Sequence, residues 1–210
     1  MSQPGTRSDS GTPRLEFVLD IACVWSYLGY ARFARVVAEH RRSGGPLEVV
    51  FRPFQVVPHA PEAGESLFDR HKRDFGADAE RKEEYLAALG RQEGIEFDFG
   101  RAVFANTFEG HRLVALASGQ GLGETMVERL FRAYFTDGVN VADRETLRSL
   151  AADVGVVWND SGAEELSTEL ARVRESGIDS VPTLTVNGGR VLTGTWSEND
   201  LRSALEAVRS

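Results

Sequence analysis

A single cysteine, Cys23, lies in a stretch whose neighbours could make it reactive. Residues 15–19 before it form an apolar run with β-branched and aromatic members, which is typical of a buried strand. Apolar residues at helical spacing follow, from Gly29 to Val37, and indicate a helix. Cys23 is therefore expected where a strand ends and a helix begins. The free N–H groups and the dipole of a helix N-terminus stabilise a thiolate, which is the nucleophilic form of cysteine. These features, together with the nearby Ser26 hydroxyl, predict a partly exposed Cys23 with a lowered pKa.

The alternative interpretation is that Cys23 is an inert, buried apolar residue, as free cysteines commonly are. One cysteine cannot form an internal disulfide, which agrees with a reducing, cytoplasmic location.

The stretch 20–29, Asp-Ile-Ala-Cys-Val-Trp-Ser-Tyr-Leu-Gly, resembles the active-site turn of the DsbA-like branch of the thioredoxin superfamily. FrnE-like members typically carry Cys-Pro-Trp-Cys-Tyr-Leu-Gly after an aspartate. Here Val24 replaces the proline and Ser26 replaces the second cysteine. The turn is also similar to that of 2-hydroxychromene-2-carboxylate isomerases and kappa-class glutathione transferases, in which serine stands at the position of Cys23. The resemblance implies catalytic roles for Cys23 and Ser26 and a place for Trp25 in the substrate cleft.

A second motif, Val181-Pro182-Thr183, resembles the Gly-Val-Pro-Thr loop of the same family, with Ser180 in place of glycine. The resemblance implies a cis proline opposite Cys23, with Val181, Pro182 and Thr183 in the substrate-binding loop. Such a loop lacks one N–H group and turns the Val181 backbone toward an extended substrate or a tripeptide thiol. Without the resemblance, a trans proline at the start of an edge strand is the expectation.

A third motif, Asn-Thr-Phe-Glu-Gly-His-Arg-Leu at 106–113, resembles the family's Asn-(Ser/Thr)-x-x-Ala-His-Arg-Leu, with Gly110 in place of alanine. The resemblance implies that Asn106 and His111 help to line the substrate cleft. The alternative is structural: Asn106 caps a helix and His111 is a half-buried, hydrogen-bonded histidine.

The order of predicted elements indicates an α/β protein. A strand at 47–54, limited by Pro53, follows the first helix, so a parallel strand–helix–strand unit opens the fold. Residues 58–138 then show helical periodicity. The resemblance implies a thioredoxin fold in which 14–57 and 139–210 form the thioredoxin-like domain. On this prediction 58–138 is an all-helical insertion and 1–13 is a disordered tail.

Local signals define the C-terminal part of the chain. Asp143 is expected to cap a helix, and Asn187-Gly188 between two β-rich runs predicts a hairpin. A last helix is expected to open at Ser197. Trp196 stands where relatives often have glutamine, which indicates either an altered wall of the cleft or, as we favour, an aromatic residue that packs on this helix.

Composition limits the partners. The net charge of −8 argues against nucleic acid and anionic membrane surfaces, and no apolar run approaches the ~20 residues of a membrane helix. The N-terminal residues lack the apolar core of a secretory signal.

The four histidines show no paired ligand spacing with Cys23, so no metal is expected, and no phosphate-binding glycine motif is present. The resemblance implies no tightly bound cofactor, with glutathione or another small thiol as a transient one. A homodimer is one option for the assembly.

Three functions stay open at this point. The first is a DsbA-like oxidoreductase with a single nucleophilic cysteine, since Ser26 cannot resolve a mixed disulfide and a small external thiol must do so. The second is a glutathione-dependent isomerase or transferase of the kappa type. The third is a non-catalytic binding protein on the same scaffold.

Overall fold

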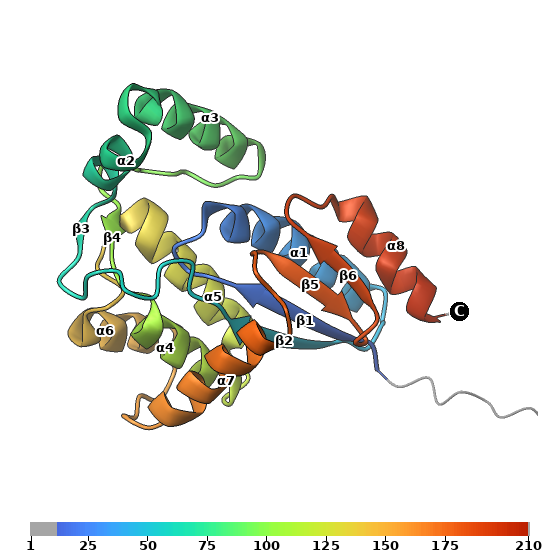
Figure 1. The fold of residues 1–210 in the computed structure, drawn as a ribbon. Coiled ribbons are helices and arrows are strands. Elements are labelled where there is room, and N and C mark those ends of the chain that lie inside the picture. Colours follow the sequence, from blue (N-terminus) through green and yellow to red (C-terminus); the bar gives the residue numbers. More distant parts are fainter. Residues whose placement is uncertain (1–11, 210) are drawn as a thin grey trace, which may run out of the picture.

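Four strands form the central sheet, in the order β2-β1-β5-β6 (Figure 1). The computed structural model describes residues 12–209, and the predicted tail at 1–13 therefore lies largely outside the described residues. Strand β1 (Arg14–Leu19) pairs in parallel with β2 (Glu48–Pro53) and antiparallel with β5 (Thr183–Val186). Strand β6 (Arg190–Thr193) completes the C-terminal hairpin and forms one edge. The predicted α/β thioredoxin-like fold is confirmed.

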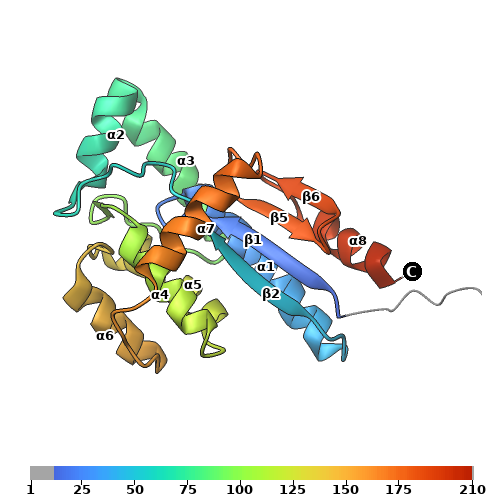
Figure 2. The same cartoon turned by 60° about the horizontal axis from the view of Figure 1, so that its bottom comes forward.

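Helices cover both faces of this sheet. Helix α1 (Val24–Arg42) and helix α8 (Glu198–Arg209) lie on one face, and α7 (Ala163–Glu175) crosses the other (Figure 2). Successive side chains of β1 point to opposite faces of the sheet, so this strand packs against helices on both sides. Phe17 packs against Phe33 of α1 with ring centroids 5.0 Å apart, whereas the adjacent Val18 belongs to a small cluster with Val173 of α7.

Between β2 and β5 the chain is mostly helical. Two helices, α2 (Leu67–Phe75) and α3 (Ala79–Gln92), form a hairpin that stands away from the sheet in both views (Figures 1 and 2). A 3₁₀ turn at Gly76–Asp78 joins them. The remaining elements are α4 (Phe108–Ser118), α5 (Gly123–Arg132), a π-helical turn at Ala133–Asp137 and α6 (Arg144–Val154).

A short antiparallel ladder also lies in this region, formed by β3 (Glu65–Ser66) and β4 (Val103–Phe104). The sequence did not predict it, because two residues are too few for a two-residue period to be recognised. The division of the chain at 57/58 and 138/139 stays a prediction. Helix α6 packs on α4 and α5, and α7 packs on β2 and α4.

The helical region and the sheet share one apolar core. The Tyr27 ring of α1 stacks on Phe131 of α5, with centroids 4.8 Å apart and planes 5° apart. This contact ties the helix that begins at Cys23 to the helical region. None of the helices within residues 12–209 is long and apolar enough to cross a membrane.

Several local predictions are confirmed. Asp143 caps α6 by accepting a hydrogen bond from the Thr146 amide, 2.7 Å away. Asn187 and Gly188 both have positive φ angles in the hairpin turn, which favours those two residue types.

Candidate active site

Cys23 is the N-cap residue of α1, with an extended backbone (φ −94°, ψ 112°). Its carbonyl accepts the first hydrogen bond of the helix from the Tyr27 amide, at 3.1 Å. The side chain is half-buried and the thiol is free. The predicted position, between a strand and a helix, and the predicted partial exposure are both confirmed.

The loop that carries Val181 and Pro182 faces this cysteine. The peptide bond between these two residues is cis, as predicted. The Cys23 sulfur lies 3.7 Å from the Val181 carbonyl oxygen. The glycine at position 29 lets the Pro182 loop lie this close to α1, because a Cβ atom there would lie only 3.0 Å from Cγ of Pro182. The motif at 20–29 and the motif at 181–183 therefore meet in space.

A buried aspartate forms the polar frame of the site. Asp20 is 1% exposed, and its carboxylate accepts hydrogen bonds from the amides of Val56 (2.7 Å) and Ala22 (3.3 Å). The Asp20 amide in turn lies 3.4 Å from Oγ of Ser26, which is fully buried. The sequence interpretation did not select Asp20 as a site residue. The available signal was a charged residue directly after a buried strand and three positions before the only cysteine of the sequence.

The pKa of Cys23 differs from the prediction. Burial raises the pKa of the thiol, and the negative charge of Asp20 adds to this effect. Hydrogen bonds from the Ser26 hydroxyl and from the amides of Ser26 and Trp25 lower the pKa, but they do not outweigh burial. The prediction of a lowered pKa was therefore wrong. It rested on the helix N-terminus and omitted the desolvation that tertiary packing imposes.

His111 and Asn106 lie in internal contacts. His111 is 2% exposed, and its Nε2 lies 2.9 Å from the Phe54 carbonyl oxygen and 3.4 Å from Oδ1 of Asp20. Asn106 accepts a hydrogen bond from the Phe108 amide (2.9 Å) at the start of α4 and donates one to the Pro58 carbonyl (2.8 Å). These contacts favour the structural interpretation of both residues, with His111 joined to the site through Asp20.

The other predicted site residues take different places. Trp25 is 37% exposed, at the start of α1. Thr183 is buried in β5 and donates to the Ser180 carbonyl at 2.9 Å, which holds the turn before Pro182. A cavity of about 210 Å³ opens beside Cys23; its lining includes Asp20, Ala22, Cys23, Val24, Val56 and Thr107.

This arrangement defines a thioredoxin-fold thiol protein: one cysteine at a helix N-terminus, a facing cis-proline loop and a buried carboxylate beneath them. The family model for a DsbA-like thioredoxin domain matches residues 14–206. The chain belongs to the DsbA-like thioredoxin family. Residues 12–209 hold no group of three or more His, Cys, Asp or Glu side chains that could bind a metal ion.

Solved structures extend this comparison. A probable DsbA oxidoreductase from Streptomyces coelicolor is 26% identical, with a TM-score of 0.83 over 94% of this chain and 90% of that one. The cytosolic disulfide reductase DsbM from Pseudomonas aeruginosa is 22% identical, with a TM-score of 0.62 over 92% and 97%. A 2-hydroxychromene-2-carboxylate isomerase is 14% identical, with a TM-score of 0.65 over 93% and 94%. The comparison with curated proteins finds no match. Both groups suggested by the sequence motifs, oxidoreductases and the isomerase, thus share this fold.

Proposed function

We propose that this protein is a monothiol thiol–disulfide oxidoreductase that uses Cys23 as its only nucleophile. The contact between the Cys23 sulfur and the Val181 carbonyl carries this proposal, because it places a free thiol beside a loop that can pair with an extended substrate. The relationship to the Streptomyces coelicolor oxidoreductase supports it.

The cycle has two exchange steps. The Cys23 thiolate attacks one sulfur of a disulfide, the S–S bond breaks, and the released thiolate takes a proton from water. A small thiol, as thiolate, then attacks the substrate sulfur of the mixed disulfide, a new disulfide forms between these two sulfurs, and Cys23 leaves as the free thiolate. Ser26 cannot perform this second step, because a serine hydroxyl is a poor nucleophile at neutral pH. Its role in the cycle is to donate a hydrogen bond to the Cys23 sulfur.

Glutathione is the external thiol we propose. The DsbM protein was crystallised with glutathione, which supports a thiol of this kind at a related site. A reducing compartment such as the cytoplasm suits this cycle, because it supplies the thiol in excess. Among the structural neighbours, DsbM is described as cytosolic and a protein from Salmonella enterica as periplasmic.

The test is trapping of the mixed disulfide. Wild-type protein incubated with oxidised glutathione is expected to gain the mass of one glutathionyl group and to lose it when reduced glutathione is added. Cys23→Ser, which keeps the shape of the site, should gain no mass. A wild-type protein that forms no adduct under conditions that modify its denatured chain would contradict the proposal.

A second candidate is a glutathione-dependent isomerase or transferase, and the raised pKa of Cys23 favours it. A thiol that keeps its proton at neutral pH can donate an S–H hydrogen bond to the thiolate of a bound cofactor. In that case saturable glutathione binding should survive in Cys23→Ser. Loss of all binding in that variant would favour the oxidoreductase.

A further inference from the structure

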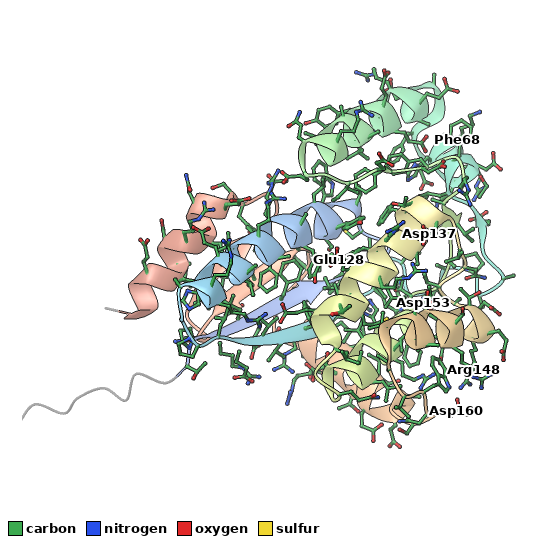
Figure 3. All side chains as sticks on the ribbon, turned by 180° about the vertical axis from the view of Figure 1, so that it is seen from behind. Phe68, Glu128, Asp137, Arg148, Asp153 and Asp160 are labelled. Carbon is green, nitrogen blue, oxygen red and sulfur yellow. The ribbon has the colours of Figure 1, made fainter. Side chains whose placement is uncertain are left out.

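A second, larger cavity of about 390 Å³ lies between the start of α1 and the α2–α3 hairpin. Phe99 and Phe135 complete its lining. Figure 3 shows the hairpin, which carries Phe68, above the end of the helical segment that carries Asp137. Nine of the twelve lining residues are apolar or aromatic: Ala22, Val24, Trp25, Leu67, Phe75, Tyr85, Leu86, Phe99 and Phe135.

Exposed aromatic side chains gather at this cavity. Among the described residues six large hydrophobic side chains are exposed, and three of them line it: Trp25 (37%), Phe75 (41%) and Tyr85 (60%). Single exposed apolar residues are common, but a cluster of aromatic residues around a concave surface indicates a binding site. The volume falls in the range of sites that hold small organic molecules.

The polar groups of the cavity are few and belong mainly to one pair. Nδ1 of His71 lies 2.7 Å from Oε1 of Glu83, and both side chains are largely buried. The His71 ring also contacts the rings of Phe75 and Phe99, with centroids 5.5 and 6.0 Å apart. Lys82 lies over the Phe75 ring at 3.8 Å. A planar ring fits such walls, and the His71–Glu83 pair can orient one polar substituent on it.

The cavity shares part of its wall with the cavity that contains Cys23. Ala22 and Val24, the two neighbours of Cys23, line both this cavity and the smaller one that contains Cys23. A group bonded to the sulfur of a substrate at Cys23 therefore has an apolar cavity within reach. Glutathione, a charged and flexible tripeptide, does not match walls of this composition, so the cavity suits a different partner in the exchange.

We infer that this cavity binds the aromatic substituent of a small thiol or disulfide whose sulfur reacts with Cys23. The inference rests on the proposed function, because it names the substrate class of the same site. In the reaction, Cys23 thiolate attacks the aromatic disulfide Ar–S–S–Ar, a Cys23–S–S–Ar bond forms, and Ar–S⁻ leaves. Phe75 and Tyr85 are then specificity-determining residues.

The first experiment compares two disulfides, 4,4′-dithiodipyridine and 2-hydroxyethyl disulfide. Each rate constant for the folded protein is divided by the rate constant for the chain denatured in urea, which removes the intrinsic reactivity of the reagent. The ratio is expected to be about tenfold larger for the aromatic reagent. The double variant Phe75→Ala with Tyr85→Ala should lose most of that preference.

Val191→Ala supplies the matched control, because Val191 is also exposed (54%) but lies on β6. This variant should keep the aromatic preference. Equal urea midpoints for the three proteins would establish that the fold is retained. An aromatic preference that is absent from wild type, or that survives in the double variant, would overturn the inference while the proposed exchange reaction still stands.

The second experiment separates the cavity from the thiol chemistry. Binding of 2-naphthol to Cys23→Ser, followed by quenching of tryptophan fluorescence, should be saturable and should weaken about tenfold when Phe75 and Tyr85 are changed to alanine. Binding of 2-naphthol in a protein whose Cys23 reacts with no disulfide would refute the proposed function and, with it, the assignment of a thiol or disulfide as the ligand of this cavity. Displacement of 2-naphthol by an unfolded polypeptide, but not by small aromatic thiols, would overturn the inference in favour of a protein substrate.

Discussion

The Cys23 sulfur and the Val181 carbonyl oxygen lie 3.7 Å apart, although 158 positions separate the two residues in the chain. A thiol can donate a hydrogen bond to a carbonyl oxygen, whereas a thiolate cannot. The contact therefore suits the protonated form of Cys23, in agreement with a raised pKa. The reactivity of Cys23 depends on the balance between its thiol and thiolate forms, which burial, the Asp20 charge and hydrogen bonds set together.

The first prediction concerns the alkylation of Cys23 by iodoacetamide. Burial raises the pKa of the thiol, so the rate should reach its midpoint at a higher pH than in the same chain denatured in urea. At pH 7 the folded protein should react more slowly, because a smaller fraction is thiolate. A midpoint below that of the denatured chain would show that the helix N-terminus outweighs burial.

The same shift predicts how stability changes with pH. The folded state holds the Cys23 proton more tightly than the unfolded state, so this contribution is fully present below the unfolded pKa. It is lost as pH rises through the folded pKa. Urea denaturation between about pH 8 and 9.5 should show wild type losing more stability than Cys23→Ser. The difference isolates the thiol from Tyr27, whose pKa burial raises to about 12. Parallel curves for the two proteins would contradict the prediction.

The Asp20 carboxylate raises the pKa of Cys23, so its removal should have the opposite effect. Asp20→Asn keeps an oxygen that can accept from the Val56 amide but removes the charge. The alkylation midpoint of Cys23 should therefore fall to a lower pH than in wild type. Asp179→Asn, at an exposed position near the cis-proline loop, is the control and should leave the midpoint unchanged. No change in Asp20→Asn would mean that the Asp20 charge does not contribute to the raised pKa of Cys23.

Gly29 is expected to be essential for packing beneath the site. In Gly29→Val the new Cβ atom would lie 3.0 Å from Cγ of Pro182 and 3.7 Å from the Trp196 ring, and the two methyl groups need further space. The variant should lose about 1–3 kcal/mol of unfolding free energy, as overpacked cores do. Gly119→Ala serves as the control, since its Cβ would meet no atom closer than 3.5 Å. Equal urea midpoints for both variants and wild type would show that the loop moves aside without cost.

The last prediction restores a second thiol. Ser26 lies one helical turn after Cys23, so Ser26→Cys should bring two sulfurs within disulfide range. Under mild oxidation this variant should lose both free thiols, and it should gain the dithiol protein-disulfide oxidoreductase activity that needs a resolving thiol, which the monothiol wild type does not have. Val24, in place of proline, changes the first turn of the helix and is expected to shift the redox potential without preventing closure.

Ser43→Cys is the control for that variant, because Ser43 lies at the opposite end of α1 and the new thiol cannot reach Cys23. It should keep two free thiols under the same oxidation. Two free thiols in Ser26→Cys as well would mean that the turn differs from a Cys-x-x-Cys site, and the isomerase-type function would then be favoured.

The sequence by itself determined the local features of this protein. The apolar run at 15–19 and the helical spacing after Cys23 fixed a strand and a helix around the thiol, because both patterns act over a few neighbouring residues. Asn187-Gly188 specified the hairpin for the same reason. The motif at 181–183 was recognised, but only the fold brings Val181 to the cysteine.

Tertiary structure decided the rest, since burial and charge depend on residues distant in the chain. The raised pKa of Cys23 arises from packing that no local pattern encodes. His111 became a buried partner of Phe54 and Asp20 because α4 packs against the end of β2. The aromatic cavity likewise combines the start of α1 with a hairpin roughly fifty residues later, and only their packing creates a concave surface beside the thiol.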